Sequence, residues 1–381
     1  MQEKEIDNQA AWVSGAFLLI TPIVAAVLTA YYLYTEPFSP AIWIFGVVFY
    51  YMTGMSITGG YHRLFSHRTY DGSKALKWYY ALFGAAAFQH SILKWSMDHR
   101  LHHRHVDTDH DPYSINKGFW YAHMGWMLTN HDYPANAESF VRDVKIDPIV
   151  AFQHKHYLWI SILMCFGFPT LIGWILGTAL GGLAVAGFLR LVTLHHTTFL
   201  INSWCHTFGK KNYTNEHTGK DSLFMALCTF GEGYHNFHHT FANDYRNGIR
   251  WYHWDPTKWV IKMSAILGLA HNLRVTSDDL ILSARLKMDE SKLKEKWSHR
   301  WEHALEERVS QMRDRVSVAQ LKWIELKKEY ALLKKTYTET SHARMEALRA
   351  EMKLAHIEFK MSWAQWKAYH SFLLVAAPVR I

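Results

Sequence analysis

Long stretches without a charged residue constrain this chain more than any other feature of its sequence. Residues 8–35, 37–61 and 156–189 contain no Asp, Glu, Lys or Arg. Each stretch is at least as long as the ~20 apolar residues that a helix needs to cross a bilayer. The mean hydropathy resembles that of a soluble protein only because the C-terminal part is densely charged. A soluble globular fold is therefore excluded.

Four membrane-spanning helices are predicted from these stretches. Their approximate bounds are Ala10–Tyr34, Ala41–Tyr61, Tyr157–Leu176 and Leu183–Leu200. The two short connections within these pairs lack Lys and Arg, whereas residues 63–155 contain eleven. Because basic segments stay on the cytoplasmic side, we expect both termini and this long segment in the cytoplasm. The prediction is an all-α fold with two membrane hairpins and a cytoplasmic helical cap, in a bacterial inner membrane.

Two features of the remaining apolar sequence need separate interpretation. Residues 75–93 form a further apolar run, but a fifth span would place the histidines on its two sides on opposite faces of the membrane. We therefore expect an interfacial helix there. Arg190 lies inside the fourth span, where a charge usually faces protein or water. Its side chain either snorkels to the membrane surface or forms an internal salt bridge, or it is a polar group near a buried site.

The C-terminal part repeats apolar residues at alternating steps of four and three, which predicts coiled-coil packing. The first series is Leu305, Val309, Met312, Val316, Ala319, Trp323, Leu326, Tyr330, Leu333 and Tyr337. The second series is Met345, Leu348, Met352, Ala355, Phe359, Trp363 and Trp366. A helix N-cap at Thr340–Ser341 separates them, so we expect an antiparallel helical hairpin. The domains are then residues 1–280, embedded in the membrane, and a charged extension, 281–381.

The charge of the extension bears on its partners. Residues 283–381 contain 20 Lys and Arg against 13 Asp and Glu. No nucleic-acid-binding fold accompanies this charge, so no nucleic acid is expected as a partner. Anionic lipid or an acidic protein is favoured instead.

Histidine is unusually frequent, at 26 residues, and eight of these fall into three clusters. The clusters are His62 and His67; His99, His102 and His103; and His235, His238 and His239. The spacing i, i+3, i+4 of the second and third clusters places their imidazoles on one helix face. The spacing i, i+5 of the first cluster requires a helix end. Imidazoles crowded in this way repel one another on protonation, and a bound cation removes that repulsion.

Eight imidazoles exceed the four ligands of one tetrahedral zinc ion. They suit two metal ions of higher coordination number. Imidazole binds iron, copper, zinc and nickel, so the type of ligand leaves the metal open.

The order of these clusters resembles the membrane-bound fatty acid desaturases of the stearoyl-CoA desaturase type. The resemblance covers about residues 10–275, and the motifs that carry it are HRLFSH, DHRLHH and GEGYHNFHHT. It implies a di-iron centre, with Fe2+/Fe3+ ions, that activates O2 and introduces a double bond into a saturated acyl chain. It also implies a ninth histidine, His206 in an NSxxH segment, and Asn202 bound to one iron through water. The implied ligands are His62, His67, His99, His102, His103, His206, His235, His238 and His239, and no further catalytic residue is expected.

Neighbouring residues are candidates for supporting roles. Carboxylates that could orient the imidazoles are Asp98, Asp107, Asp111 and Glu232. Candidates for the lining of an acyl tunnel are Thr198, Phe199 and Trp204.

The chain departs from the family at its coenzyme A contacts. Met97 replaces an Arg of the animal members, and Thr129-Asn130 replaces an Arg-Lys pair. Phosphate binding needs such cations, so their absence weakens acyl-CoA as the substrate. Phospholipid-bound acyl chains, acyl carrier protein or coenzyme A held in a different way stay open. Cations that could serve another headgroup are Arg63, Arg68, Lys94 and Arg104. A separate ferredoxin-like protein is expected to supply electrons, and the extension is expected to mediate oligomerisation, membrane attachment or docking of that protein.

Two other functions compete with desaturation. A hydroxylase uses the same chemistry but inserts oxygen into the substrate. A membrane metal transporter would place its ligands at bilayer depth along a pathway, whereas these clusters lie at the cytoplasmic ends of the spans.

Overall fold

The computed structural model describes residues 2–129, 133–134, 136–298, 301–335 and 342–376. It divides the chain into two compact units, which we treat separately. The N-terminal unit comprises residues 1–211 and 216–275, and the C-terminal unit comprises residues 212–215 and 276–381. Within the described residues the fold is helical, apart from one antiparallel pair of two-residue strands. The predicted all-α class is confirmed.

Four helical rods of the N-terminal unit are long and apolar enough to cross a membrane, and they cover Trp12–Thr35, Pro40–Ser66, Tyr157–Ile175 and Ala179–Thr207. The four predicted spans are therefore confirmed. Their elements are α1 (Gln2–Thr35), α2 (Pro40–Met55), η1 (Ser56–Ser66), α8 (Tyr157–Ile162), η5 (Leu163–Gly167), α9 (Phe168–Ile175), α10 (Ala179–Gly181), η6 (Gly182–Leu189) and α11 (Arg190–Thr207). Large apolar side chains on these rods are exposed, among them Leu19, Ile23 and Trp174. Such exposure suits a lipid environment.

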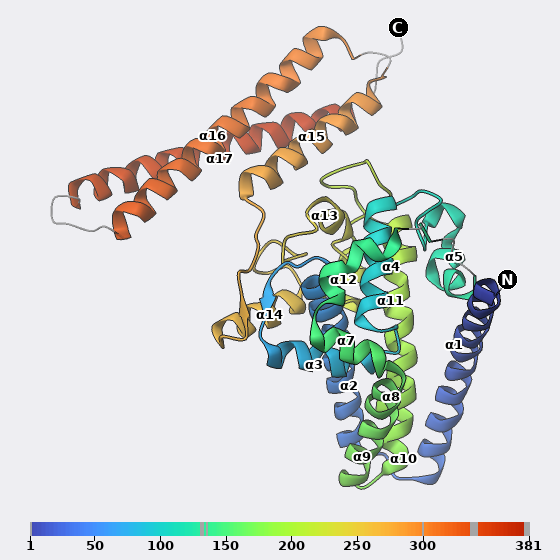
Figure 1. Ribbon diagram of the computed structural model, residues 1–381. Coiled ribbons are helices and arrows are strands. Elements are labelled where there is room, and N and C mark those ends of the chain that lie inside the picture. Colours follow the sequence, from blue (N-terminus) through green and yellow to red (C-terminus); the bar gives the residue numbers. More distant parts are fainter. Residues whose placement is uncertain (1, 130–132, 135, 299–300, 336–341, 377–381) are drawn as a thin grey trace. The chain divides into compact units, whose positions relative to one another are not determined.

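Shorter elements cover the ends of these rods that carry the histidines (Figure 1). They are β1 (Asp71–Gly72), α3 (Lys74–Ala85), α4 (Ile92–His105), η2 (Ile115–Lys117), α5 (Phe119–His123), η3 (Gly125–Leu128), η4 (Ala137–Val141), α6 (Arg142–Lys145), α7 (Pro148–Lys155), α12 (Leu223–Cys228), α13 (His235–Thr240), α14 (Pro256–Ile266) and β2 (Ala270–His271). The strands pair Asp71 with His271 and Gly72 with Ala270.

The expected single interfacial helix over residues 75–93 is wrong. The chain forms α3, then an irregular segment over 86–91, then α4. Ser91 caps α4 by accepting a hydrogen bond from the Lys94 N–H, and Phe88 and His90 have positive φ angles of 51° and 69°. A cap and two left-handed residues end one helix and start another.

Arg190 holds this irregular segment in place. Its guanidinium is buried and donates hydrogen bonds to the carbonyls of Ala86 (2.9 Å) and Ala186 (3.0 Å). It also lies 4.7 Å from the centroid of the Phe49 ring. The guanidinium is therefore buried and does not snorkel, and its hydrogen-bond partners are backbone carbonyls and Cys165. Among the described residues no carboxylate forms a salt bridge with it.

Close helix packing at η1 depends on glycine. A Cβ on Gly60 would lie 2.5 Å from the Tyr80 ring of α3, and one on Gly84 would lie 2.3 Å from the Tyr61 ring. These two close approaches bring α3 directly against η1, the π-helical segment that carries His62.

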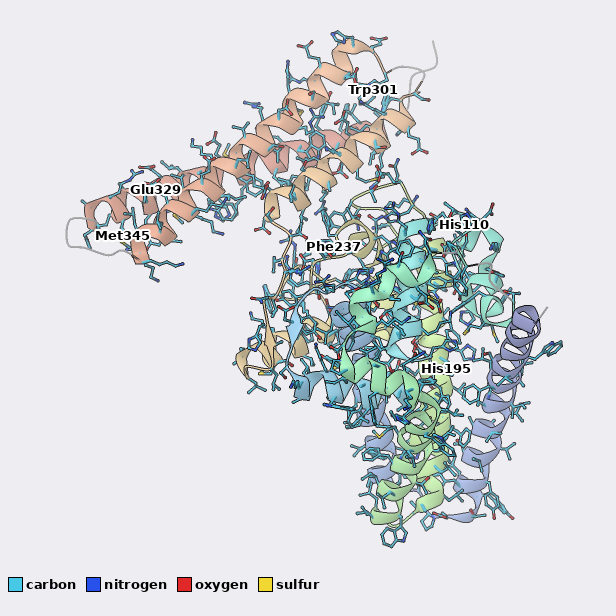
Figure 2. The ribbon with its side chains drawn as sticks, in the orientation of Figure 1. His110, His195, Phe237, Trp301, Glu329 and Met345 are labelled. Carbon is cyan, nitrogen blue, oxygen red and sulfur yellow. The ribbon has the colours of Figure 1, made fainter. Side chains whose placement is uncertain are left out.

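The C-terminal unit contains three helices, α15 (Asp278–Lys296), α16 (His303–Lys335) and α17 (His342–Val375). Lys322 pairs with Glu358, and Arg344 pairs with Glu329, so α16 and α17 run antiparallel; Glu329 and Met345 mark their adjoining ends (Figure 2). Buried residues of the unit include Val309, Val316 and Trp366 of the two predicted apolar series. The coiled-coil packing of α16 and α17 stays a prediction. Tyr337 of the first apolar series and the predicted N-cap at Thr340–Ser341 lie outside the described residues. The helix α15 was not predicted.

Candidate metal centre

The first histidine pair lies on a widened helical turn. η1 is a π-helix whose last residue is Ser66, and the His67 N–H donates to the His62 carbonyl at 3.0 Å. This i to i+5 hydrogen bond brings both imidazoles to one side, with ring centroids 4.8 Å apart. A π-helical turn thus solves the spacing problem that the sequence raised.

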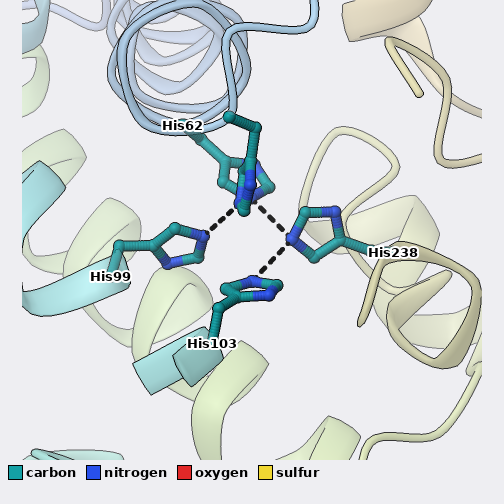
Figure 3. A group of neighbouring side chains, drawn as sticks. His62, His99, His103 and His238 are labelled. Carbon is teal, nitrogen blue, oxygen red and sulfur yellow. Dashed lines mark hydrogen bonds between the residues drawn. The ribbon is translucent and has the colours of Figure 1, made fainter. Parts of the chain in front are cut away.

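The remaining histidines come from three helices. His99, His102 and His103 lie on α4, His206 lies near the end of α11, and His235, His238 and His239 lie on α13. Figure 3 shows imidazoles from η1, α4 and α13 pointing toward one another.

The nine imidazoles form two groups, and within each group one ligand atom per residue lies within 4.8 Å of the others. The five-histidine group is His62, His67, His99, His103 and His238. The four-histidine group is His102, His206, His235 and His239. Each HxxHH cluster contributes to both groups. Helix α4 places His99 and His103 in the five-histidine group and His102 in the other, whereas α13 places only His238 in the five-histidine group. All nine predicted histidines are therefore brought together.

Distances between ring nitrogens match the geometry of a shared cation. In the five-histidine group, the Nε2 atom of His238 lies 2.9 Å from that of His62 and 3.0 Å from that of His103. In the four-histidine group, the Nε2 atom of His235 lies 3.0 Å from those of His206 and His239. Neighbouring ligands are about 3.0 Å apart around an octahedral ion with bonds of about 2.1 Å, and about 3.4 Å apart around a tetrahedral one.

Outer hydrogen bonds set the tautomers of several rings. The Nδ1–H of His62 donates to Glu232 at 3.0 Å, and that of His102 donates to Asp111 at 2.8 Å. Because carboxylates only accept, each Nε2 atom keeps its lone pair for a metal. Two of the four candidate carboxylates thus contact an imidazole directly.

The other two carboxylates differ. Asp107 reaches His206 through Thr218, whose hydroxyl lies 2.5 Å from Asp107 and 2.7 Å from the His206 Nδ1 atom. Asp98 instead accepts hydrogen bonds from Lys94 and Tyr133. Thr218 was missed from the sequence, because no spacing motif marks a hydroxyl that acts through an imidazole.

Glu232 is itself held by a buried ion network. Arg63 donates to Glu232 at 2.9 Å and to Asp255 at 3.0 Å. Burial alone would raise the pKa of Glu232, but His62 and Arg63 lower it to about 2. Arg63 therefore orients a ligand partner and does not serve a headgroup. Lys94 is likewise bound, and Arg68 lies beside Asp143.

Burial keeps six of the imidazoles outside the spans neutral. It lowers the pKa of His67, His99 and His103 well below the ordinary value, and neighbouring imidazoles lower it further. The same causes lower the pKa of each α13 histidine. Neutral imidazole is the form that binds metal.

A cavity of about 340 Å³ leads to both groups. Its walls include Phe17, Ile57 and Leu194, and His62, His99, His102 and His235 also line it. Among the described residues that line it, none is Lys or Arg. The cavity can therefore accept an apolar chain and bring it to the imidazoles.

The predicted lining residues have different outcomes. Thr198, Phe199 and Asn202, all on α11, line the cavity. Trp204 instead packs on Phe208 and Phe224. Asn202 lines the same cavity as four of the nine histidines. Its contact with a metal ion through water remains a prediction.

A comparison of the sequence with protein families decides the class. The fatty acid desaturase family matches residues 37–266. The chain belongs to this family. The match includes all nine histidines and ends at the last residue of α14, so residues 276–381 of the C-terminal unit lie outside it.

Individual desaturases are similar over most of the chain. A probable acyl-CoA desaturase of Schizosaccharomyces pombe is 42% identical over 75% of this chain and 59% of its own length. Acyl-CoA desaturase 1 of Saccharomyces cerevisiae is 42% identical over 67% of this chain and 50% of its own length. The sn-1 stearoyl-lipid 9-desaturase of Anabaena variabilis is 36% identical over 60% of this chain and 82% of its own length. The chain thus spans only half to three fifths of the two yeast proteins.

Proposed function

We propose that this protein is an O2-dependent fatty acyl desaturase that introduces a double bond into a saturated acyl chain. The observation that carries the proposal is the apolar cavity that leads to two groups of converging imidazoles. The family match and the names of the relatives support it.

The nine histidines are the proposed ligands of two iron ions, five around one and four around the other. Asn202 is proposed to contact one of these ions through water. Five imidazoles around one ion exceed the four ligands of a tetrahedral site, which supports a coordination number above four for that ion. Iron is favoured because the proposed reaction needs a redox metal, and imidazole suits iron.

The reaction balances with an external electron donor. Removal of two hydrogen atoms from adjacent methylenes forms the double bond, and these atoms, with two electrons and two protons, reduce one O2 to two waters. Bound iron supplies the activation of O2. The residues of this chain hold the acyl chain against the imidazoles, exclude water with Phe17 and Ile57, and keep Nδ1–H on His62 and His102.

The substrate's headgroup is proposed to be acyl-CoA or phospholipid, because relatives named for each are similar to the chain. The position of Met97 beside Asp98 on α4 weakens binding of a coenzyme A phosphate at this point. Asn130 of the other departure lies outside the described residues.

The C-terminal unit is proposed to be a domain of its own, residues 281–381, that attaches to membranes, forms oligomers or docks an acidic ferredoxin-like electron donor. Its excess of Lys and Arg supports an acidic partner. We also propose cytoplasmic termini, from the basic residues of segment 63–155. The location of the protein in a bacterial inner membrane remains a prediction, which cell fractionation would test.

The test is expression in a host that lacks its own desaturases, in an atmosphere of 18O2, with lipid mass spectrometry. We expect monounsaturated acyl chains without 18O, together with O2 consumption. A product that carries 18O would establish the hydroxylase instead. Reversible metal binding without O2 consumption would favour a transporter. His238→Ala is the matched inactive control.

A further inference from the structure

A tenth histidine, His217, lies beside the four-histidine group. It belongs to the irregular segment before Lys220, and its side chain is buried, with 9% of the residue exposed. Its ring centroid lies 4.9 Å from that of His239, with the rings tilted by 42°. No HxxHH or NSxxH spacing includes it.

The segment that carries His217 is tied to the metal centre at several points. Thr218 bonds to His206 and Asp107, and the Gly219 carbonyl accepts a hydrogen bond from the Asn236 side chain at 2.9 Å. A Cβ on Gly219 would lie 2.9 Å from the His217 Nδ1 atom and 3.4 Å from the His239 ring. The absence of a side chain there lets the two imidazoles lie close together.

A backbone hydrogen bond fixes the tautomer of His217. The Gly219 N–H donates to the Nδ1 atom at 3.1 Å. Because that nitrogen accepts, the proton of the neutral ring is on Nε2. An Nε2 atom with a proton does not ligate a metal, so His217 differs from the nine other imidazoles.

This Nε2–H has no hydrogen-bond partner among the residues that the structure describes. A buried donor without an acceptor is destabilising, so such a group points to a partner that the protein does not itself supply. Four imidazoles leave positions open on a metal ion of higher coordination number, and a small ligand there would lie beside His239.

We propose that the Nε2–H of His217 donates a hydrogen bond to a small anionic or oxygen ligand at an open position of the metal ion held by His102, His206, His235 and His239. The inference rests on the proposed metal centre. It assigns His217 to the binding of the exogenous ligand and not to the binding of the metal.

Azide is a suitable probe, because it is a small anion that occupies open positions on ferric ions. The full-length protein, His217→Phe and His217→Gln are compared by metal content and by titration of azide with optical detection. Phe removes the donor but keeps a buried ring, whereas Gln keeps an N–H. His253→Phe is the matched control, since the His253 Nδ1 atom also has no partner among the described residues but its ring stacks on Tyr234.

We expect His217→Phe to retain both metal ions and to bind azide roughly tenfold more weakly, the effect of losing one hydrogen bond to a charged ligand. The azide affinity of His217→Gln should stay within about threefold of that of the parent protein, and His253→Phe should bind azide as tightly as the parent does. Unchanged azide affinity in His217→Phe, or loss of metal from it, would overturn the proposal. Absence of metal and azide binding in the parent would instead refute the proposed centre.

Discussion

The Nδ1 atom of His102 lies 2.8 Å from the Oδ1 atom of Asp111, and both side chains are almost completely buried. Asp111 is fixed in turn by the backbone N–H groups of Asp107 and Tyr113. The carboxylate therefore dictates which nitrogen of His102 faces the other imidazoles.

Asp111→Asn should weaken metal binding at the four-histidine group by roughly 10–100-fold, the usual effect of losing an outer partner of a ligand. The amide N–H of the new side chain and the Nδ1–H of His102 are both donors and repel each other, so the His102 ring would turn. Competition with a chelator measures the affinity. Asp109→Asn, an exposed neighbour, serves as the control, and equal metal retention by both variants would contradict the tautomer argument.

Single ligand variants should separate the two groups. His238→Ala removes a ligand of the five-histidine group and His102→Ala one of the four-histidine group. Each should abolish desaturation and lower iron content, while the protein still inserts into membranes. Elemental analysis of the purified variants measures this. Unsaturated product from either variant would refute the ligand assignment.

Deletion of residues 283–381 should leave the iron content unchanged. All nine proposed ligands lie in the N-terminal unit. The measurement is iron per protein after purification from membranes. A truncated protein that inserts but lacks iron would show that the extension contributes to the centre.

Gly60→Ala should lower the thermal stability of the N-terminal unit, because the new methyl would lie 2.5 Å from the Tyr80 ring. Overpacking of this kind costs ~1–3 kcal/mol. Gly167→Ala is the control, since its Cβ would lie 3.8 Å from Leu163, an ordinary contact. Equal melting temperatures in detergent would exclude tight packing at η1.

The Asp143 carboxylate should make the stability of the fold weakly dependent on pH under acidic conditions. Partial burial would raise its pKa, but two hydrogen bonds from Arg100 outweigh this and the pKa lies below the ordinary value. Its stabilisation is therefore complete above pH ~4 and is lost as the pH falls through the folded-state pKa. The side chain is a third exposed, so we expect at most about 1 kcal/mol. In Asp143→Asn, the free energy of unfolding should depend less steeply on pH in this window. A slope equal to that of the parent protein would contradict the stabilising role of Asp143.

The sequence was sufficient for the parts of this molecule that have strong local signals. Uncharged stretches gave the four spans, and the histidine spacing gave eight of the nine imidazoles. The ninth, His206, followed only from the resemblance to the desaturase family. The assignment of His102 and His238 to different groups could not be predicted, because it depends on how α4 and α13 face each other.

Local backbone events were the main omissions. The π-helical hydrogen bond between His62 and His67 has no composition signature, and the break at residues 86–91 is hidden by its apolar sequence. Thr218 and His217 act through a loop whose path is set by Asp107 and Gly219. Such contacts join residues that are remote in the sequence.

Anomalous X-ray diffraction at the iron absorption edge, from crystals of the purified protein, tests the central claim most directly. We predict two peaks, one among the Nε2 atoms of the five-histidine group and one among those of the four-histidine group. A single peak, or peaks away from these imidazoles, would contradict the account.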